Sequence, residues 1–207
     1  SKLIAECDAL IYDSLIPKEF LELSPNDCRH FFVGKRGGQH SLSQVQINKL
    51  LVEISKDHSC IVRLKGGDPF LFGRGAEEAE WLTRHNVEVE VVPGITSGIA
   101  APSYMGIPLT HREAGSSVTF ITGHEAENKI GPTVNWRALA NATDGIVIYM
   151  GIHNLDYIIN ELISGGLDPE TPSAIIHQGT LMSQKCITAP LNKLLNKKQV
   201  YGMSSPS

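Results

Sequence analysis

The stretch "RLKGGDPFLFGRG", residues 63–75, joins an apolar run to a helical pattern and decides the fold class. The run that leads into it, "CIVRL" at 60–64, is almost continuously apolar, which is typical of a buried parallel strand. The segment that follows, 75–85, has acidic residues in its first turn and basic residues in its last, as the helix dipole favours. The stretch is therefore predicted to be a glycine-rich loop between a strand and a helix.

The same alternation of strand and helix patterns continues along the whole chain. The predicted strands are 9–13, 60–64, 87–94, 116–123, 144–151 and 172–180, and the predicted helices are 41–57, 75–85 and 154–166. This order predicts an α/β protein with mostly parallel sheets. Polar and small residues at 108–117 separate two sets of strands and helices, so we expect two α/β domains, 1–112 and 113–207.

Composition and charge exclude several classes of protein. The net charge of −4 over 207 residues argues against nucleic acid as a partner, and no apolar run approaches the roughly 20 residues that cross a membrane. The four cysteines form no CxxC pair, which favours reduced thiols in the cytoplasm over disulfides or a zinc site. The loop histidines His40, His111 and His124 lack ligand spacing, so none is assigned to a metal.

Glycine-rich or small polar turns follow five of the predicted strands. They are "KGGDP", "PGITSG", "TGHE", "YMG" and "HQGT". Ligands of parallel α/β proteins bind beyond the carboxyl ends of the strands. Five such turns together predict a crevice in which the backbone approaches a ligand closely.

The loop "GGDP" at 66–69 matches neither the GxGxxG pattern of dinucleotide-binding folds nor the GxxxxGK[ST] pattern of phosphate-binding loops. Its glycines leave backbone N–H groups accessible to a carboxylate, and Phe70 and Phe72 offer apolar surface for a nucleobase. These features favour an adenosyl-type ligand. Taken alone, the loop is equally compatible with a tight strand-to-helix turn that binds nothing.

Four longer motifs, "VGKRGG", "RLKGGDPFLFGRG", "VVPGITSGIAAPSYMGIPLTHR" and "SVTFITGHE", resemble the uroporphyrinogen-III C-methyltransferases of the tetrapyrrole methylase family. They stand in the family's order and span nearly the whole chain. The resemblance implies two α/β domains, usually in a homodimer, with S-adenosylmethionine in the cleft between the domains. It implies two methyl transfers to uroporphyrinogen III, at C-2 and C-7, giving precorrin-2 and S-adenosylhomocysteine on the way to sirohaem or cobalamin.

The resemblance also implies roles for individual residues. Asp13 of "IYDSL" resembles the family's proposed proton acceptor, and Lys35 of "VGKRGG" resembles its proposed proton donor. The implied donor-binding residues are Gly66, Gly67, Asp68, Leu71, Thr96, Ser97, Met150 and Gly179. From residue type alone, Asp13 also suits a helix N-cap, and Lys35 also suits a solvated loop.

A substrate with eight carboxylates requires basic side chains, since an arginine can grip a carboxylate through two parallel hydrogen bonds. The candidates for substrate binding are Arg36, Arg63, Arg74 and Arg112, with Lys35 beside them. Arg63 is notable because it interrupts an apolar strand two residues before the glycine loop. A structural ion pair is the alternative for Arg63.

Two further expectations concern the chain ends and the activity. Family members begin with a strand and a "GxGPGDP" loop and finish with a closing strand, so we expect each domain here to lack one edge strand and this chain alone to bind the donor weakly. The alternatives to the uroporphyrinogen enzyme are another tetrapyrrole methylase, acting on later corrinoids, and a non-catalytic donor-binding subunit.

Overall fold

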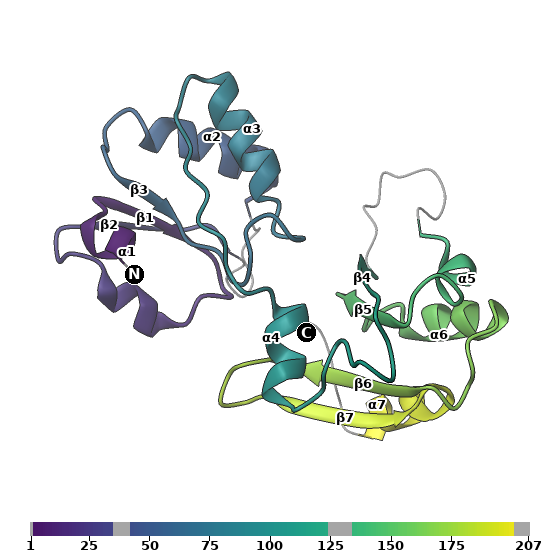
Figure 1. Ribbon diagram of the computed structural model, residues 1–207. Helices are drawn as coiled ribbons and strands as arrows, with labels where there is room; N and C mark the ends of the chain where they lie inside the picture. Colours follow the sequence, from purple (N-terminus) through teal and green to yellow (C-terminus); the bar gives the residue numbers. More distant parts are fainter. Residues whose placement is uncertain (1, 35–41, 124–133, 201–207) are drawn as a thin grey trace. The chain divides into compact units, whose positions relative to one another are not determined.

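The computed structural model describes residues 2–34, 42–123 and 134–200, and it divides the chain into two compact units, Ser1–Thr96 and Ser97–Ser207 (Figure 1). The described part of the first unit has one sheet and one hydrophobic core cluster, and that of the second unit has two sheets and two such clusters. The α/β fold class is confirmed. Among the described residues, no helix has the length and apolar content needed to span a bilayer.

A three-stranded parallel sheet forms the centre of the first unit. Its strands are β1 (Ala9–Tyr12), β2 (Arg29–Phe32) and β3 (Ile61–Arg63), in the order β2-β1-β3. The helices of this unit are α1 (Lys2–Glu6), the 3₁₀ helix η1 (Lys18–Leu23), α2 (Gln44–Ile54) and α3 (Gly75–Arg84). Ile11 of β1 is in register with Arg63 of β3, so the carboxyl ends of these two strands lie side by side.

Helix α2 packs its apolar face on this sheet. The buried core consists of Ala9, Ile11, Val33, Ile47, Leu51 and Ile54. The helix begins at a capping box, in which the Ser43 side chain accepts a hydrogen bond from the Gln46 backbone and the Gln46 side chain accepts one from the Ser43 backbone. The helix predicted at 41–57 is thus confirmed, with its serine cap at Ser43.

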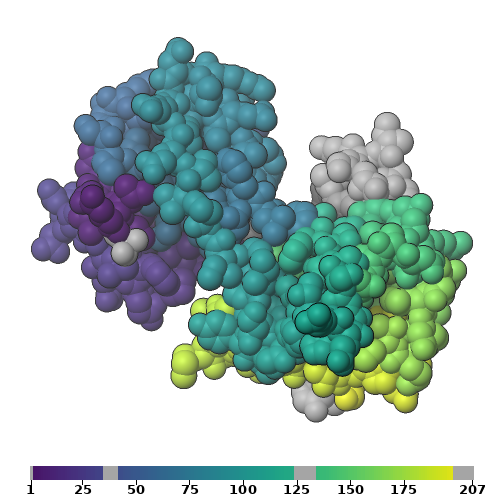
Figure 2. Space-filling model, viewed as in Figure 1, coloured from purple at the N-terminus to yellow at the C-terminus, as the bar shows by residue number. Residues whose placement is uncertain are grey.

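The strand predicted at 87–94 is wrong. Residues 87–96 form neither a helix nor a strand, and they cross one face of the first unit, where their teal atoms reach the surface (Figures 1 and 2). The side chains of Val89, Val91 and Val92 are 36%, 39% and 55% exposed. The alternation of Val and Glu favoured a strand, but a strand also needs a neighbour, and in the described part of the chain no other strand pairs with this segment.

The second unit contains one parallel and one antiparallel pair of strands. The parallel pair is β4 (Val118–Thr122) with β5 (Gly145–Tyr149), and the antiparallel pair is β6 (Pro172–His177) with β7 (Lys185–Pro190). The helices are α4 (Ser97–Tyr104), α5 (Trp136–Leu139), α6 (Leu155–Ser164), the 3₁₀ helix η2 (Leu191–Lys193) and α7 (Leu194–Val200).

Helix α6 links the two sheets of this unit. Its Ile158 and Leu162 are buried with Trp136 and with apolar side chains of β4 and β5. Its Leu155 and Ile159 are buried with side chains of the β6–β7 hairpin. Two different stripes of one amphipathic helix therefore serve two cores, which explains its strong hydrophobic periodicity.

The division between the units falls before α4, whereas the sequence placed the domain boundary after Arg112. Helix α4 groups with the second unit because it packs on β5. The backbone N–H of Gly98 donates a hydrogen bond to Tyr149 Oη at 2.9 Å, and a Cβ at Gly98 would lie 2.2 Å from that oxygen. Glycine therefore permits this close approach of the helix.

Candidate active site

The loop after β3 is organised around the carboxylate of Asp68. Its Oδ1 accepts hydrogen bonds from the backbone N–H groups of Phe70 at 2.8 Å and Leu71 at 3.1 Å, and its Oδ2 accepts one from Gly94 at 3.1 Å. The bond from Gly94, followed by that from Phe70, holds the pKa of Asp68 below its usual value. Asp68 thus anchors its own loop to the segment at 94–96.

The two segments that the sequence assigned to donor binding in the first unit are in direct contact. Gly94 approaches Gly67 so closely that a Cβ at Gly94 would lie 2.1 Å from the Gly67 carbonyl oxygen. Gly67 has a φ of 75°, which favours glycine. Thr96 is buried, at 5% exposure. The structure therefore brings Gly67, Asp68 and Thr96 into one region.

The exit of the loop folds back on itself before α3 begins. The Gly75 N–H donates to the Pro69 carbonyl oxygen at 2.9 Å, and both Phe72 and Arg74 have positive φ, at 56° and 58°. The Arg74 guanidinium forks onto Glu77, with Nε–Oε1 at 3.0 Å and Nη2–Oε2 at 2.6 Å. This pair is about half exposed. Arg74 is therefore at the surface, oriented by its own helix.

Asp13 lines a cavity next to the glycine loop. Its Oδ1 accepts a hydrogen bond from the Leu15 N–H at 3.0 Å, which closes a tight turn after β1. It is not a helix N-cap, because η1 begins at Lys18 after Pro17. A Cβ at Gly66 would lie 3.5 Å from Leu15 Cβ, so this turn and the loop after β3 are neighbours. The cavity measures about 360 Å³ and is lined by Tyr12, Asp13, Ser14, Ile16, Lys18, Leu21 and Phe32.

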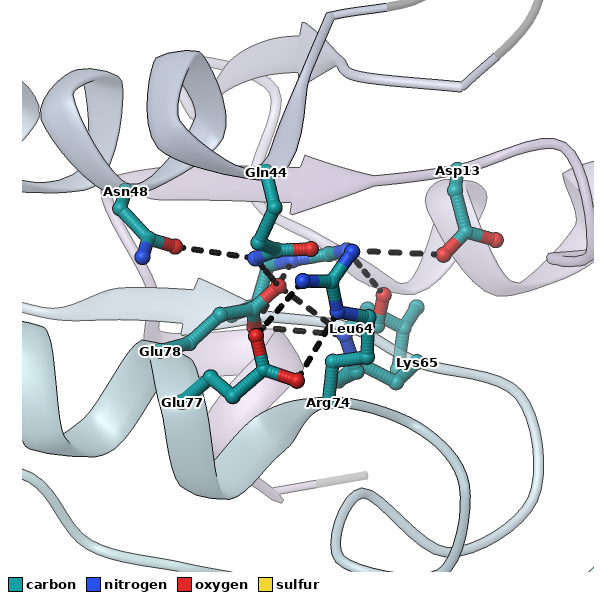
Figure 3. A network of polar contacts seen from close by, with 9 residues as sticks. Asp13, Gln44, Asn48, Leu64, Lys65, Arg74, Glu77 and Glu78 are labelled. Carbon is teal, nitrogen blue, oxygen red and sulfur yellow. Dashed lines mark hydrogen bonds and ion pairs between the residues drawn. The ribbon is translucent and has the colours of Figure 1, made fainter. Parts of the chain in front are cut away.

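Behind Asp13 lies a network of buried charges (Figure 3). Arg63, 15% exposed, places Nη2 3.5 Å from Asp13 Oδ2 and Nε 3.4 Å from Glu78 Oε2. Lys65, 11% exposed, donates to both oxygens of Glu78, at 3.1 and 3.2 Å. Gln44 of α2 donates to Glu78 Oε1 at 3.1 Å and to Asn48 at 2.9 Å. The positive charges of Arg63 and Lys65 are therefore balanced by the negative charges of Asp13 and Glu78.

Burial affects the pKa of Lys65. Desolvation, together with the neighbouring charge of Arg63, lowers the pKa of Lys65 below its usual value, while Glu78 acts in the opposite direction. Glu78 itself is 5% exposed at the side chain. A carboxylate in that position satisfies both of the cations, so its removal leaves positive charge uncompensated.

The second unit holds the remaining predicted donor-binding residues. Ser97 is exposed at the start of α4. Met150 directly follows β5, with a φ of 55° and 43% exposure. Gly179 follows β6, and a Cβ there would lie 2.5 Å from Ala101 Cβ of α4. Packing on α4 thus gives Gly179 a structural reason to be glycine, independent of any ligand.

The remaining predicted site residues are two that the structure does not describe and one exposed arginine. Lys35 and Arg36 lie outside the described residues. Arg112 is exposed on the second unit. Lys65 and Glu78 were not predicted from the sequence as site residues. The sequence contains a signal for Glu78. It lies three residues after Gly75 and four before Leu82, so it is on the same face of the helix, and the buried face of a helix normally carries apolar residues.

Comparison with known proteins identifies the family. A model of the tetrapyrrole (corrin/porphyrin) methylases matches residues 1–195. The chain belongs to this family. It is 49% identical to the uroporphyrinogen-III C-methyltransferase of Methanocaldococcus jannaschii over 206 residues, which cover 99% of this chain and 84% of the relative. It is 44% identical to that of Synechocystis over 205 residues, covering 99% of this chain and 78% of the relative.

A solved structure supports the same assignment to the tetrapyrrole methylases. The uroporphyrin-III C-methyl transferase of Thermus thermophilus, complexed with S-adenyl homocysteine, superposes with a TM-score of 0.80. Its sequence is 32% identical, and the match covers 100% of this chain and 84% of that one. The resemblance inferred from the motifs is therefore confirmed.

The contact between Gly94 and Gly67 predicts that a side chain at position 94 destabilises the first unit. We expect Gly94→Ala to lower the free energy of unfolding by about 1–3 kcal/mol, because backbone must shift to admit the methyl group. Gly66→Ala is the matched control, since its Cβ would meet nothing nearer than 3.5 Å. Denaturant titration of both variants tests this, and equal losses of stability would contradict it.

The lowered pKa of Asp68 predicts an acid-sensitive loop. A folded pKa below the unfolded one means that the carboxylate stabilises the protein above about pH 4, and that this contribution is lost as the pH falls through the folded value. We expect the stability of the wild type to fall more steeply than that of Asp68→Asn between about pH 4 and pH 2. Denaturant titrations across this range measure the slopes. Asp27→Asn, at an exposed acid, should keep the wild-type slope.

Proposed function

We propose that this protein transfers methyl groups from S-adenosylmethionine to C-2 and C-7 of uroporphyrinogen III, producing precorrin-2 on the way to sirohaem or cobalamin. Relatives that carry the name of this enzyme match 99% of the chain at 44% and 49% identity, which supports the proposal. The structural observation that carries it is the position of Asp13 on a cavity beside the glycine loop, at adjoining strand ends.

The residues around the glycine loop are compatible with an adenosyl donor. Gly66 and Gly67 are exposed, and a Cβ at Gly66 would make only an ordinary contact with Leu15, at 3.5 Å. We propose that the donor-binding residues are Gly66, Gly67, Asp68, Leu71, Thr96, Ser97, Met150 and Gly179. Asp68 acts by fixing its loop against the segment at 94–96, since three backbone N–H groups already occupy its carboxylate.

The bound donor supplies a methyl group on a sulfonium, which an electron-rich pyrrole carbon attacks in line. The chain then has two tasks, which are to orient the two molecules and to accept the proton that the methylated ring releases. Asp13 is suited to the second task. Its Oδ1 is held by Leu15, its Oδ2 lies beside Arg63, and it lines the cavity. We assign proton donation to Lys35, which lies outside the described residues.

Cationic side chains would receive the carboxylates of the substrate. We propose Arg36, Arg74 and Arg112 for this role, because a guanidinium binds a carboxylate through two hydrogen bonds. Glu77 holds the Arg74 guanidinium in place and leaves part of it exposed. Arg63 is different, because Asp13, Glu78 and the Leu64 carbonyl oxygen already surround its guanidinium.

An activity assay with a matched pair of variants tests this proposal. We expect the protein to place two labelled methyl groups on uroporphyrinogen III in the absence of oxygen. Asp13→Asn should lower kcat by roughly 10²–10⁴-fold because it removes the proton acceptor. Asp27→Asn, at an exposed acid before β2, should keep wild-type turnover.

Three outcomes would contradict the proposal in different ways. Donor binding without any label in the tetrapyrrole would favour a non-catalytic subunit. Label in a corrinoid but not in uroporphyrinogen III would favour another activity within the family. Full turnover by Asp13→Asn would remove Asp13 from the mechanism while leaving the activity itself in place.

We also propose that the protein is a cytoplasmic homodimer. The family resemblance supports the dimer, and the four free cysteines suit a reducing compartment. Sedimentation equilibrium of the purified chain should give twice the monomer mass. A monomer at micromolar concentration would contradict the dimer.

A further inference from the structure

The carboxylate of Asp13 is held from behind by groups that do not line the cavity. Its Oδ2 faces Arg63 Nη2 at 3.5 Å, and the Nε of the same guanidinium faces Glu78 Oε2 at 3.4 Å. The Arg63 Nη1 is occupied by the Leu64 carbonyl oxygen at 2.9 Å. The guanidinium thus makes one hydrogen bond and lies within ion-pair distance of two carboxylates.

Glu78 is the fixed end of this chain of contacts. It projects from α3, is 5% exposed at the side chain, and receives Lys65 on both oxygens. Gln44 holds Oε1 from α2, and Asn48 in turn holds the Gln44 amide. Glu78 is thus contacted by Lys65, Gln44 and Arg63, as the dashed lines of Figure 3 mark. An arginine paired with such a group has a defined position.

We propose that Glu78 and Arg63 are positioning residues for methyl transfer, which act by holding the carboxylate of Asp13, a residue that lines the cavity, in a defined position. This inference rests on the proposed function and goes beyond it, because it gives a catalytic consequence to buried groups that do not line the cavity. A proton acceptor displaced by about 1 Å can lose roughly a hundredfold in rate. Arg63 accordingly acts through Asp13 and does not bind the substrate.

Removing Glu78 alone is a poor test, because it leaves Arg63 and Lys65 with only Asp13 as a counter-charge and so destabilises the whole unit. The balanced variant Lys65→Met with Glu78→Met removes one cation and one anion together. Apolar side chains of similar volume often replace a buried pair without loss of stability. Arg63 and Asp13 remain as a neutral pair, but Arg63 loses its anchor.

The experiment compares kcat, KM and thermal stability of this double variant with those of the wild type, in the label-transfer assay with uroporphyrinogen III. We expect a thermal midpoint near that of the wild type, a KM for S-adenosylmethionine that is unchanged, and a kcat lowered by roughly 10–100-fold. Glu80→Gln is the control, since it alters an exposed acid on the same helix. It should leave kcat unchanged.

A third substitution separates positioning from a general structural effect. If Glu78 acts through Asp13, adding Asp13→Asn to the double variant gives a kcat no lower than that of Asp13→Asn alone. Multiplying losses would overturn the inference, as would wild-type kcat in a stable double variant. Absence of turnover in the wild type would instead overturn the proposed function, so the two failures are distinguishable.

Discussion

A guanidinium inside the first unit must be neutralised by negative charge, and this constraint connects the sheet to the candidate active site. Arg63 is the last residue of β3 and is 15% exposed, so an unpaired charge there would cost several kcal/mol. Its two partners come from different directions, Asp13 from the end of β1 and Glu78 from α3. The contacts that make the charge tolerable therefore also fix the helix on the sheet and the acid beside the cavity.

A second constraint is the close approach of backbone at the glycine loop. Gly94 can approach the Gly67 carbonyl oxygen because it has no side chain on the facing side, and Asp68 ties the two segments together by accepting a hydrogen bond from the Gly94 N–H. The arrangement needs no ligand to explain it. It nevertheless leaves exposed glycine backbone at a strand end, which is the geometry that a ligand of a parallel sheet requires. The glycines therefore allow close packing of the backbone and also leave it accessible to a ligand.

Local patterns predicted the three longest described helices and five of the described strands. Apolar runs marked β1 and β3, and caps and periodicity marked α2 and α6, because each of these signals lies within a single element. Strand β2, "RHFF", was missed since two of its four residues are polar. The segment 87–94 was predicted as a strand on equally good local grounds, but strand formation depends on a partner elsewhere in the chain.

The amino-acid sequence by itself determined the α/β class, the family and the segments in which glycine loops follow strands, since motifs and periodicity are properties of contiguous residues. Only the tertiary structure decided that Arg63 is paired inside the unit, that Glu78 is buried as its anchor, and that the loop at 94–96 leans on Gly67. These facts depend on contacts between residues 15 to 50 positions apart in the chain, and a local pattern carries no information on which of them meet.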